Sequence, residues 1–430
     1  MSRPSLSPNS TGHAPELVPG RQAAQAFIFV TILLDFMAMG VIVPVLPRLI
    51  QTLGGGTAGQ VAKIFGVFAA IFALLQFIAQ PVQGALSDRF GRRPIILASN
   101  FGLGFDYMLM ALAPGLGWLL LGRIIAGAAA GSLPAASAYM ADVSGGEDRA
   151  GGFGRIWAAA SAGIVLGPLL GGALSGVDLR APFWAAAGLS LANGLYGLFV
   201  LPESLRREHR APVQFNQLNP VGALVHLGRR YPGLLGMMLV SFLSGLTWQG
   251  INPLFVVYTI FRYHWTPLDI SLLLAVLGGC NCVLQIWITP LAVKWAGERR
   301  VALFGIAAQV AALLTFGLAQ SSGRFWLGVP LLCAGNLAGP AWQALISNRV
   351  SATEQGRLSG ALSGLFAVAG IVAPITLTSL FAMVTGAKFT SLWLGAPFFV
   401  ACFTSALAFA VAALTSRQPG RGPEAVEMGV

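Results

Sequence analysis

Twelve apolar segments make up most of the chain, and charged residues are largely confined to the stretches between them. About 20 residues in a helix span the roughly 30 Å hydrocarbon core of a bilayer. Because backbone polar groups cannot be left unsatisfied in lipid, such segments are expected to be helices. The sequence is 56% hydrophobic and only 10% charged, which excludes a soluble protein. We therefore expect an all-α integral membrane protein with 12 transmembrane helices.

The basic residues orient the chain. Of its 26 Lys and Arg residues, 19 fall on the side shared by both termini, six fall on the other side, and Arg123 lies within a span. Loops rich in Lys and Arg stay in the cytoplasm. We therefore expect both termini to be cytoplasmic, and we attribute the net charge of +11 to these loops rather than to nucleic-acid binding.

A polar stretch at residues 202–232 interrupts the series of spans after the sixth. It carries several Glu and Arg residues and no apolar run of span length. The N-terminal residues lack the apolar core of a signal peptide. We predict five parts: a cytoplasmic tail (1–22), a six-helix bundle (23–201), a cytoplasmic linker (202–232), a second six-helix bundle (233–415) and a cytoplasmic tail (416–430).

The two predicted bundles repeat each other at an offset near 206 residues. Pro134 and Ala135 recur as Pro340 and Ala341, and the glycine-rich run at 163–168 recurs at 370–374. Two six-helix repeats related by an axis along the membrane normal are a transporter architecture with the substrate site between the halves. The spans expected from the apolar runs include 24–46, 65–86, 94–113, 118–140, 233–258, 270–293, 301–319, 325–346, 358–384 and 392–414.

Residues 84–94, between the second and third spans, form a very short charged loop, Gly-Ala-Leu-Ser-Asp-Arg-Phe-Gly-Arg-Arg-Pro. Gly84 removes side-chain bulk where the helix ends, and Gly91 supplies the backbone freedom of a tight turn. The pattern resembles the signature loop between helices 2 and 3 of the major facilitator superfamily. The resemblance implies a gating loop made of Gly84, Asp88, Arg89, Gly91, Arg92 and Arg93.

Three charged residues lie deep within predicted spans: Asp35, Asp106 and Arg123. Charges at this depth are costly and face the protein interior or a water-filled cavity. Counting about 1.5 Å per residue from the span ends puts Asp106 and Arg123 at similar depths. They are expected to pair, either within a proton switch or as a static ion pair that fixes two helices. Asp35 is either a proton-coupling residue or a packing carboxylate.

The fifth span has a regular glycine pattern. On one helical face, glycines let a second helix approach closely, which is ordinary membrane-helix packing. The spacing, however, resembles the motif that marks the drug/proton antiporter branch of the superfamily and is largely absent from symporters. The resemblance therefore implies export, through Gly163, Gly167, Pro168, Gly171 and Gly172.

The second half lacks deep carboxylates. Ser241 and Ala312 stand where the repeat would place counterparts of Asp35 and Asp106. Its spans offer neutral polar and aromatic groups instead, which suit the binding of an amphipathic ligand, although interhelical hydrogen bonding is an equal alternative. These candidates are Trp248, Gln249, Asn252, Asn281, Gln285, Gln309, Asn336, Trp342 and Gln343.

Residues 34–47, 87–94 and 106–107, with others, are similar to the tetracycline/proton antiporters. The resemblance extends through all 12 spans, and it implies that Asp88 faces the start of span eleven in one conformation. In two departures, Asn281 replaces a family histidine and Ala308 replaces an acidic residue. Both family residues are linked to export of metal-chelated tetracycline. Roles in coupling, gating or substrate handling are implied for Asp35, Asp88, Arg92, Ser99, Asp106, Arg123 and Gln285.

We expect a proton-driven exporter of amphipathic small molecules, such as tetracycline-like drugs, in the bacterial inner membrane, working by alternating access as a monomer. The alternative is a proton-coupled carrier of an endogenous metabolite, either an exporter or an uptake symporter. We expect no cofactor besides the proton gradient, and the two departures argue against a substrate-chelated divalent cation.

Channels and enzymes fit the sequence less well. A channel is disfavoured because no ring of pore charges is visible. An enzyme is disfavoured because none of the four histidines lies in a predicted span. The four cysteines lie in apolar segments and offer neither a disulfide framework nor a metal site.

Overall fold

The computed structural model describes residues 21–130, 132–143, 149–205, 208, 210, 227–231, 233–351, 354–386 and 393–416. The predicted tails before residue 21 and after residue 416 lie outside the described residues, as does most of the predicted linker. What is described is almost entirely helical.

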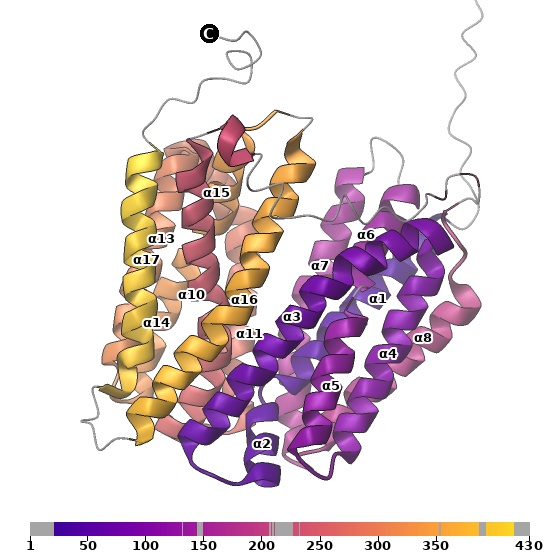
Figure 1. Cartoon of the computed structure of the whole chain (residues 1–430), viewed down its shortest axis with the longest axis horizontal. Coiled ribbons are helices and arrows are strands. Elements are labelled where there is room, and N and C mark those ends of the chain that lie inside the picture. The colour runs from indigo at the N-terminus through magenta and orange to yellow at the C-terminus, as the bar shows by residue number, and fades with distance from the viewer. Residues whose placement is uncertain are drawn as a thin grey trace, which may run out of the picture.

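Twelve helical stretches in the described chain are long and apolar enough to cross a membrane, which confirms the predicted number. They form two groups that lie side by side in Figure 1. The first group contains α1 (Arg21–Ile42), α3 (Ala58–Phe90), α4 (Arg92–Leu112), α5 (Leu116–Ala129) with α6 (Ser132–Val143), α7 (Arg149–Ser175) and α8 (Ala181–Val200). The second contains α10 (Leu234–Tyr263), α11 (Pro267–Val283) with α12 (Thr289–Ala296), α13 (Glu298–Leu318), α14 (Ser322–Gly335) with α15 (Ala338–Ser347), α16 (Gln355–Gly386) and α17 (Ala396–Thr415).

The second group repeats the helix boundaries of the first. Helices α4, α5 and α6 begin at residues 92, 116 and 132, and α13, α14 and α15 each begin 206 residues later. Gly91 and Gly297, also 206 residues apart, both have a positive φ, 111° and 80° respectively. The repeat seen in the sequence is therefore a repeat of structure, including its tight turns.

Two predicted spans are broken at corresponding places. The fourth span stops at Ala129 and resumes at Ser132, and the tenth stops at Gly335 and resumes at Ala338. In the eighth span, the five residues Leu284–Ile288 form a π-helical turn just before Pro290. Proline lacks an amide hydrogen and π-turns often mark functional positions, so this helix has a local irregularity that hydropathy cannot reveal.

The first predicted span is shorter than expected. It ends at Ile42, because the chain turns at Pro44 and enters the short helix α2 (Leu46–Gly54). Helix α2 is amphipathic, with Leu46, Leu49 and Ile50 buried. It caps one end of the molecule, here called the α2 end, opposite the end that carries Gly91, here called the loop end (Figure 1).

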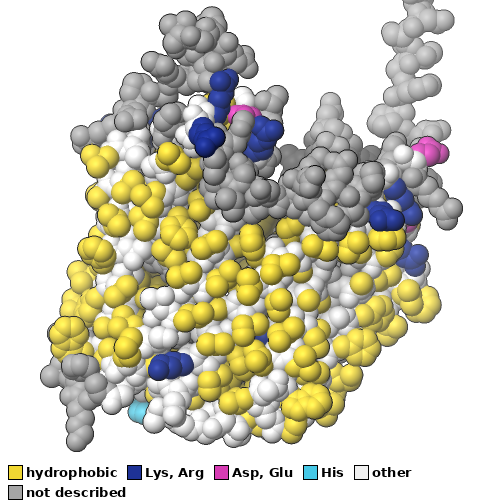
Figure 2. All heavy atoms as spheres, in the orientation of Figure 1, with side chains coloured by type: hydrophobic (Ala, Val, Ile, Leu, Met, Phe, Trp, Pro, Cys, Tyr) yellow, Lys and Arg dark blue, Asp and Glu magenta, His cyan; other side chains and the backbone are white. Residues whose placement is uncertain are grey.

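The two groups touch along the half of the molecule nearest the α2 end. A Cβ atom on Gly59 of α3 would lie 2.9 Å from the Cα of Ala382 in α16. Further along the same two helices, a Cβ atom on Gly370 of α16 would lie 3.3 Å from the Cβ of Ala73 in α3. Toward the loop end, α3 and α16 diverge (Figure 1). Figure 2 shows hydrophobic side chains over the middle of this face and most visible Lys and Arg near the loop end.

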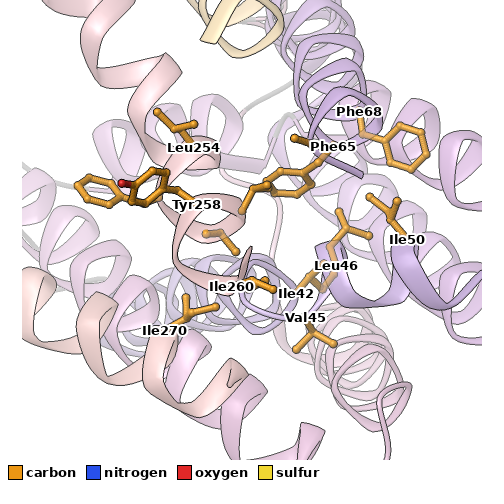
Figure 3. Close-up of a cluster of buried hydrophobic side chains, with 14 of the residues drawn as sticks. Ile42, Val45, Leu46, Ile50, Phe65, Phe68, Leu254, Tyr258, Ile260 and Ile270 are labelled. Carbon is orange, nitrogen blue, oxygen red and sulfur yellow. The ribbon is translucent and has the colours of Figure 1, made fainter. Parts of the chain in front are cut away.

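A buried apolar cluster closes the α2 end. Figure 3 shows Ile42, Leu46 and Phe65 of the first group facing Leu254 and Tyr258 of the second. Beside this cluster, the Arg48 side chain donates a hydrogen bond to the backbone oxygen of Trp265, 3.0 Å away. Burial of apolar surface and this bond both hold the two groups together at the α2 end.

Candidate functional site

A buried ion pair joins α4 to α5. Arg123 donates to one carboxylate oxygen of Asp106 at 3.2 Å, and Asp106 is fully buried. Its guanidinium also lies 2.9 Å from the Met110 sulfur and 5.8 Å from the centre of the Phe72 ring. The Oδ1 atom of Asp106 has no hydrogen-bond partner. The pair is thus joined through a single carboxylate oxygen, which leaves an acceptor free for a proton.

Asp35, on α1, is the second buried carboxylate and has no cationic partner among the described residues. It is only 6% exposed, and neither of its oxygens accepts a hydrogen bond. Ser132 of α6 and Asn193 of α8 lie beside it, without the geometry of a hydrogen bond. An ionised carboxylate is expensive in such surroundings, so binding a proton here changes the energy of this conformation strongly.

Acidic residues from other parts of the chain hold the signature loop. Asp88 and Arg92 form an ion pair one helical turn apart, and Arg92 also reaches Asp142 at the end of α6, with 3.3 Å between Nε and Oδ2. The Glu203 carboxylate, just after α8, accepts hydrogen bonds from the backbone amides of Arg92 (2.9 Å) and Arg93 (3.3 Å). These amides begin α4, so a carboxylate is well placed against the positive end of the helix dipole.

Gly91 and Gly84 play different parts in the loop. A Cβ atom on Gly91 would collide with the Glu203 carboxylate, and its φ of 111° disfavours any side chain. Gly84 has no atoms close to where its Cβ would lie. Asp88 is half-exposed, and Arg89 lies over the Phe90 ring, 5.2 Å from its centre. In this conformation the loop therefore makes contacts within the first group.

The glycine pattern of α7 serves close packing. Cβ atoms on Gly163 and Gly167 would collide with the backbone of α1, and so would one on Gly171. The Pro168 ring packs closely against Gly40 of α1. Gly172 instead faces Ser271 and Leu268 of α11, across the contact between the two groups. Four of the five motif residues therefore join α7 to α1, and one contributes to closure at the α2 end.

The substrate candidates of the second half are only partly brought together. Asn336, at the α14–α15 break, donates to Asn281 of α11 at 2.6 Å. Gln309 of α13 packs against Gly335, the neighbour of Asn336. Two of the candidate amides, Asn281 and Asn336, are therefore in direct contact, and the backbone and Cβ atom of Gln309 lie next to them.

The remaining candidates are dispersed. Asn252 donates to the backbone oxygen of Trp248 in its own helix, and Gln249 lies against Gly370 of α16. Trp342 is buried in a core cluster and donates to the backbone oxygen of Met237, at 3.3 Å, so its contacts are those of a packing residue. Three further candidates take no part in these contacts. Gln285 and Gln343 are exposed, whereas Ser99 is buried, with its hydroxyl 3.5 Å from the Gln83 side chain.

Comparison with known proteins decides the family. A family model described as the Major Facilitator Superfamily matches residues 28–374 and, in a second match, residues 237–428. The chain belongs to the major facilitator superfamily.

Its similar proteins within the superfamily include tetracycline resistance proteins. The class C protein of Escherichia coli is 37% identical over 376 residues, covering 86% of this chain and 93% of that protein. The class G protein of Vibrio anguillarum is 35% identical over 370 residues, with the same coverage of 86% and 93%. The resemblance to the tetracycline antiporters inferred from the motifs is thereby confirmed.

Solved structures of the superfamily share the fold. A bacterial homologue of the human lysosomal transporter Spinster, in an inward-facing and unoccupied conformation, has a TM-score of 0.74 at 18% identity, covering 93% of this chain and 98% of that one. The nucleoside transporter NupG has a TM-score of 0.73 at 14% identity, covering 92% and 100%. The predicted fold class, two six-helix bundles, is confirmed.

Four side chains that contact the signature loop or the α5–α6 break were not predicted as site residues from the sequence. Asp142 and Glu203 hold the signature loop, and Gln80 and Gln83 of α3 donate to the carbonyls of Ala130 and Ala128 at the α5–α6 break. The signal for the glutamines was their spacing of three residues, which puts both on one helix face. Among the described residues, no group of three His, Cys, Asp or Glu could hold a metal ion.

Proposed function

We propose that the protein is a proton-coupled exporter of amphipathic small molecules that works by alternating access. One observation carries the proposal: the first bundle contains two buried carboxylates, while the described helices of the second bundle place Asp269, Glu298 and Glu354 only at helix ends. Ionisable residues inside the membrane are expensive and are typical of proton pathways. The names of the tetracycline resistance proteins support drugs as the substrate class.

In this proposal the moving units are residues 23–201 and 233–415, connected by the linker at 202–232. Both termini and the loop end are cytoplasmic, the membrane is the bacterial inner membrane, and one chain suffices because it contains both halves. The conformation described here, joined at the α2 end, is then the inward-facing state.

Protons and substrate act on the same equilibrium. Protonation of Asp35 or Asp106 from outside favours the inward-facing state, because a neutral carboxyl tolerates burial better than an ionised one. Release of the proton inside, with capture of a drug, resets the transporter. A ligand shifts such an equilibrium only through its different affinities for the two states, so proton and drug must bind alternately.

Substrate contact is assigned to the amide pair Asn281 and Asn336, to Gln309 and to neutral groups nearby. The resemblance implies that Asn281 and Ala308 stand where the tetracycline antiporters have ionisable residues, so we propose neither a metal-chelated substrate nor a cofactor. Membership of the major facilitator superfamily supports a transporter rather than an enzyme.

Transport in reconstituted vesicles tests this function. With a proton gradient imposed, tetracycline and a panel of cationic and neutral amphipathic drugs should move against the proton flux. Movement of a compound in the same direction as protons would instead indicate an uptake symporter. If no drug moves through protein that remains folded, a carrier dedicated to an endogenous metabolite becomes the better account.

A further inference from the structure

The interior of the first bundle contains polar atoms that no protein group satisfies. Apart from atoms of the Asp106–Arg123 pair, these include atoms of three side chains from three helices: both oxygens of Asp35, the amide oxygen and nitrogen of Asn100, and the hydroxyl of Ser190. Asp35 is 6% exposed, and the other two are fully buried. Nearly all buried polar groups in proteins have a partner, and orphaned ones point to a bound water or ion.

Packing of α1 against α8 brings Asp35 and Ser190 to one level. Gly197 lies against Phe27, and Thr31 donates to the Asn193 side chain at 3.2 Å. The two helices run in opposite directions, so a step of four residues from Phe27 to Thr31 on α1 matches a step of four residues from Gly197 back to Asn193 on α8. The next step along both helices places Asp35 opposite Leu189, which is within one residue of the level of Ser190.

Packing of α4 against α8 brings Asn100 to the same region. Gly197 also lies against Leu97, and Gly194 lies against Phe101. This register puts Asn100 beside Gly194, within about one helical turn of Asn193. The registers thus put all three unsatisfied side chains within about one helical turn of the depth of Asn193, which itself lies beside Asp35.

The break between α5 and α6 contributes a further residue next to Asp35. Ser132 is the first residue of α6 and lies beside Asp35. The first amides of a helix lack partners within the helix and carry partial positive charge. Helix starts that point at a buried charge inside the membrane are a recurrent feature of transporter sites.

We propose that Asp35, Asn100, Ser132, Ser190 and Asn193 enclose a cluster of ordered water molecules through which the coupling proton reaches Asp35. The idea rests on the proposed proton coupling and adds a route to it. Asp35 is shielded from bulk solvent, so a proton needs carriers, and water both donates and accepts. A metal cation in the same place would satisfy Asp35 but not the Asn100 amide nitrogen, which is a donor. Tyr107 of α4, the sequence neighbour of Asp106, is also within electrostatic range of Asp35.

Two variants test the cluster, with a matched control from the repeat. Ser190→Ala and Asn100→Leu each remove cluster atoms and leave both carboxylates in place. The control is Ser405→Ala, because Ser405 is the tenth residue of α17 as Ser190 is of α8, yet its hydroxyl is bonded to Thr247 at 3.1 Å. Gel filtration and thermal unfolding identify any variant that misfolds, and Ser190→Ala changes only one atom.

The readouts are infrared difference spectra in H₂¹⁶O and H₂¹⁸O and the rate of proton release when tetracycline is added. We expect water bands sensitive to ¹⁸O in the wild-type protein and in the control, lost or shifted in both variants. Proton release should slow by about tenfold in the variants, with tetracycline affinity unchanged.

Two results would overturn the cluster: no ¹⁸O-sensitive bands in the wild-type protein, or bands and rates that both variants leave unchanged. A requirement for Na⁺ would also overturn it, since a cation would then occupy the space. Drug-induced proton release by the wild-type protein tests the proposed function separately, because the water bands can be measured upon acidification without any drug.

Discussion

The two buried carboxylates differ at the scale of single residues in what surrounds them. Asp106 shares its charge with Arg123 over 3.2 Å, whereas Asp35 has only neutral groups beside it. A proton added to Asp106 weakens an ion pair, and a proton added to Asp35 removes an isolated buried charge. The two sites are therefore expected to respond to conformational change in different ways.

Replacing Asp106 separates coupling from stability. Asp106→Asn should abolish proton release and also destabilise the protein, because loss of one partner of a buried pair typically costs about 3–5 kcal/mol. The double variant Asp106→Asn/Arg123→Gln should regain thermal stability without regaining proton release. If Asp106→Asn releases protons as the wild-type protein does, Asp106 has no role in coupling.

The turn before α4 gives a second prediction for single residues. Gly91→Ala combines an unfavourable φ with a collision against Glu203, whereas Gly297→Ala has a similar φ and no atoms near the new Cβ. We expect Gly91→Ala to destabilise the protein by roughly 1–3 kcal/mol more than Gly297→Ala, measured by thermal unfolding. Equal losses would mean that the Glu203 contact is unimportant.

At the scale of helices, apolar length predicted all 12 spans, because a bilayer demands about 20 apolar residues per helix. It did not predict the breaks at Ala130 and Asn336 or the π-turn at Leu284–Ile288. Those features depend on neighbouring helices that satisfy freed backbone groups, as Gln83 does for Ala128. The pairing of Asp106 with Arg123 could be predicted, because counting residues from the span ends puts both at the same depth in the membrane. The contact between Glu203 and Arg92 could not, because these residues are 111 positions apart and meet only through tertiary packing.

The close contact between α7 and α1 is testable with neighbouring glycines. Gly167→Ala places a Cβ against the Gly40 Cα at 2.9 Å, whereas Gly154→Ala, in the same helix, meets nothing within 4 Å. We expect Gly167→Ala to lower stability by about 1–3 kcal/mol and Gly154→Ala to leave it nearly unchanged, in thermal unfolding of purified protein. A harmless Gly167→Ala would show that the two helices can separate without cost.

At the scale of the whole molecule, the two bundles are joined at the α2 end and diverge toward the loop end (Figure 1). Gly172 lies in this joint, against Ser271 of the other bundle. Gly172→Leu should hold the α2 end apart, because the larger side chain has no space when the bundles meet. Distances between spin labels on α7 and α11 should lengthen at that end.

The control is Gly279→Leu, on the partner helix α11, at a position where an added Cβ atom would meet nothing within 4 Å. It should leave the distances as in the wild-type protein. Unchanged distances in Gly172→Leu would contradict the view that this contact closes the α2 end.

If drug export is coupled to protons through the carboxylates of the first bundle, drug binding should release protons from the protein. Proton release should be measured on purified protein in detergent after addition of tetracycline and other amphipathic drugs, with Asp35→Asn and Asp106→Asn alongside. We predict release by the wild-type protein with at least one drug, and loss of that release in each variant. Release that persists in both variants, or no release with any compound from folded wild-type protein, would contradict the claim.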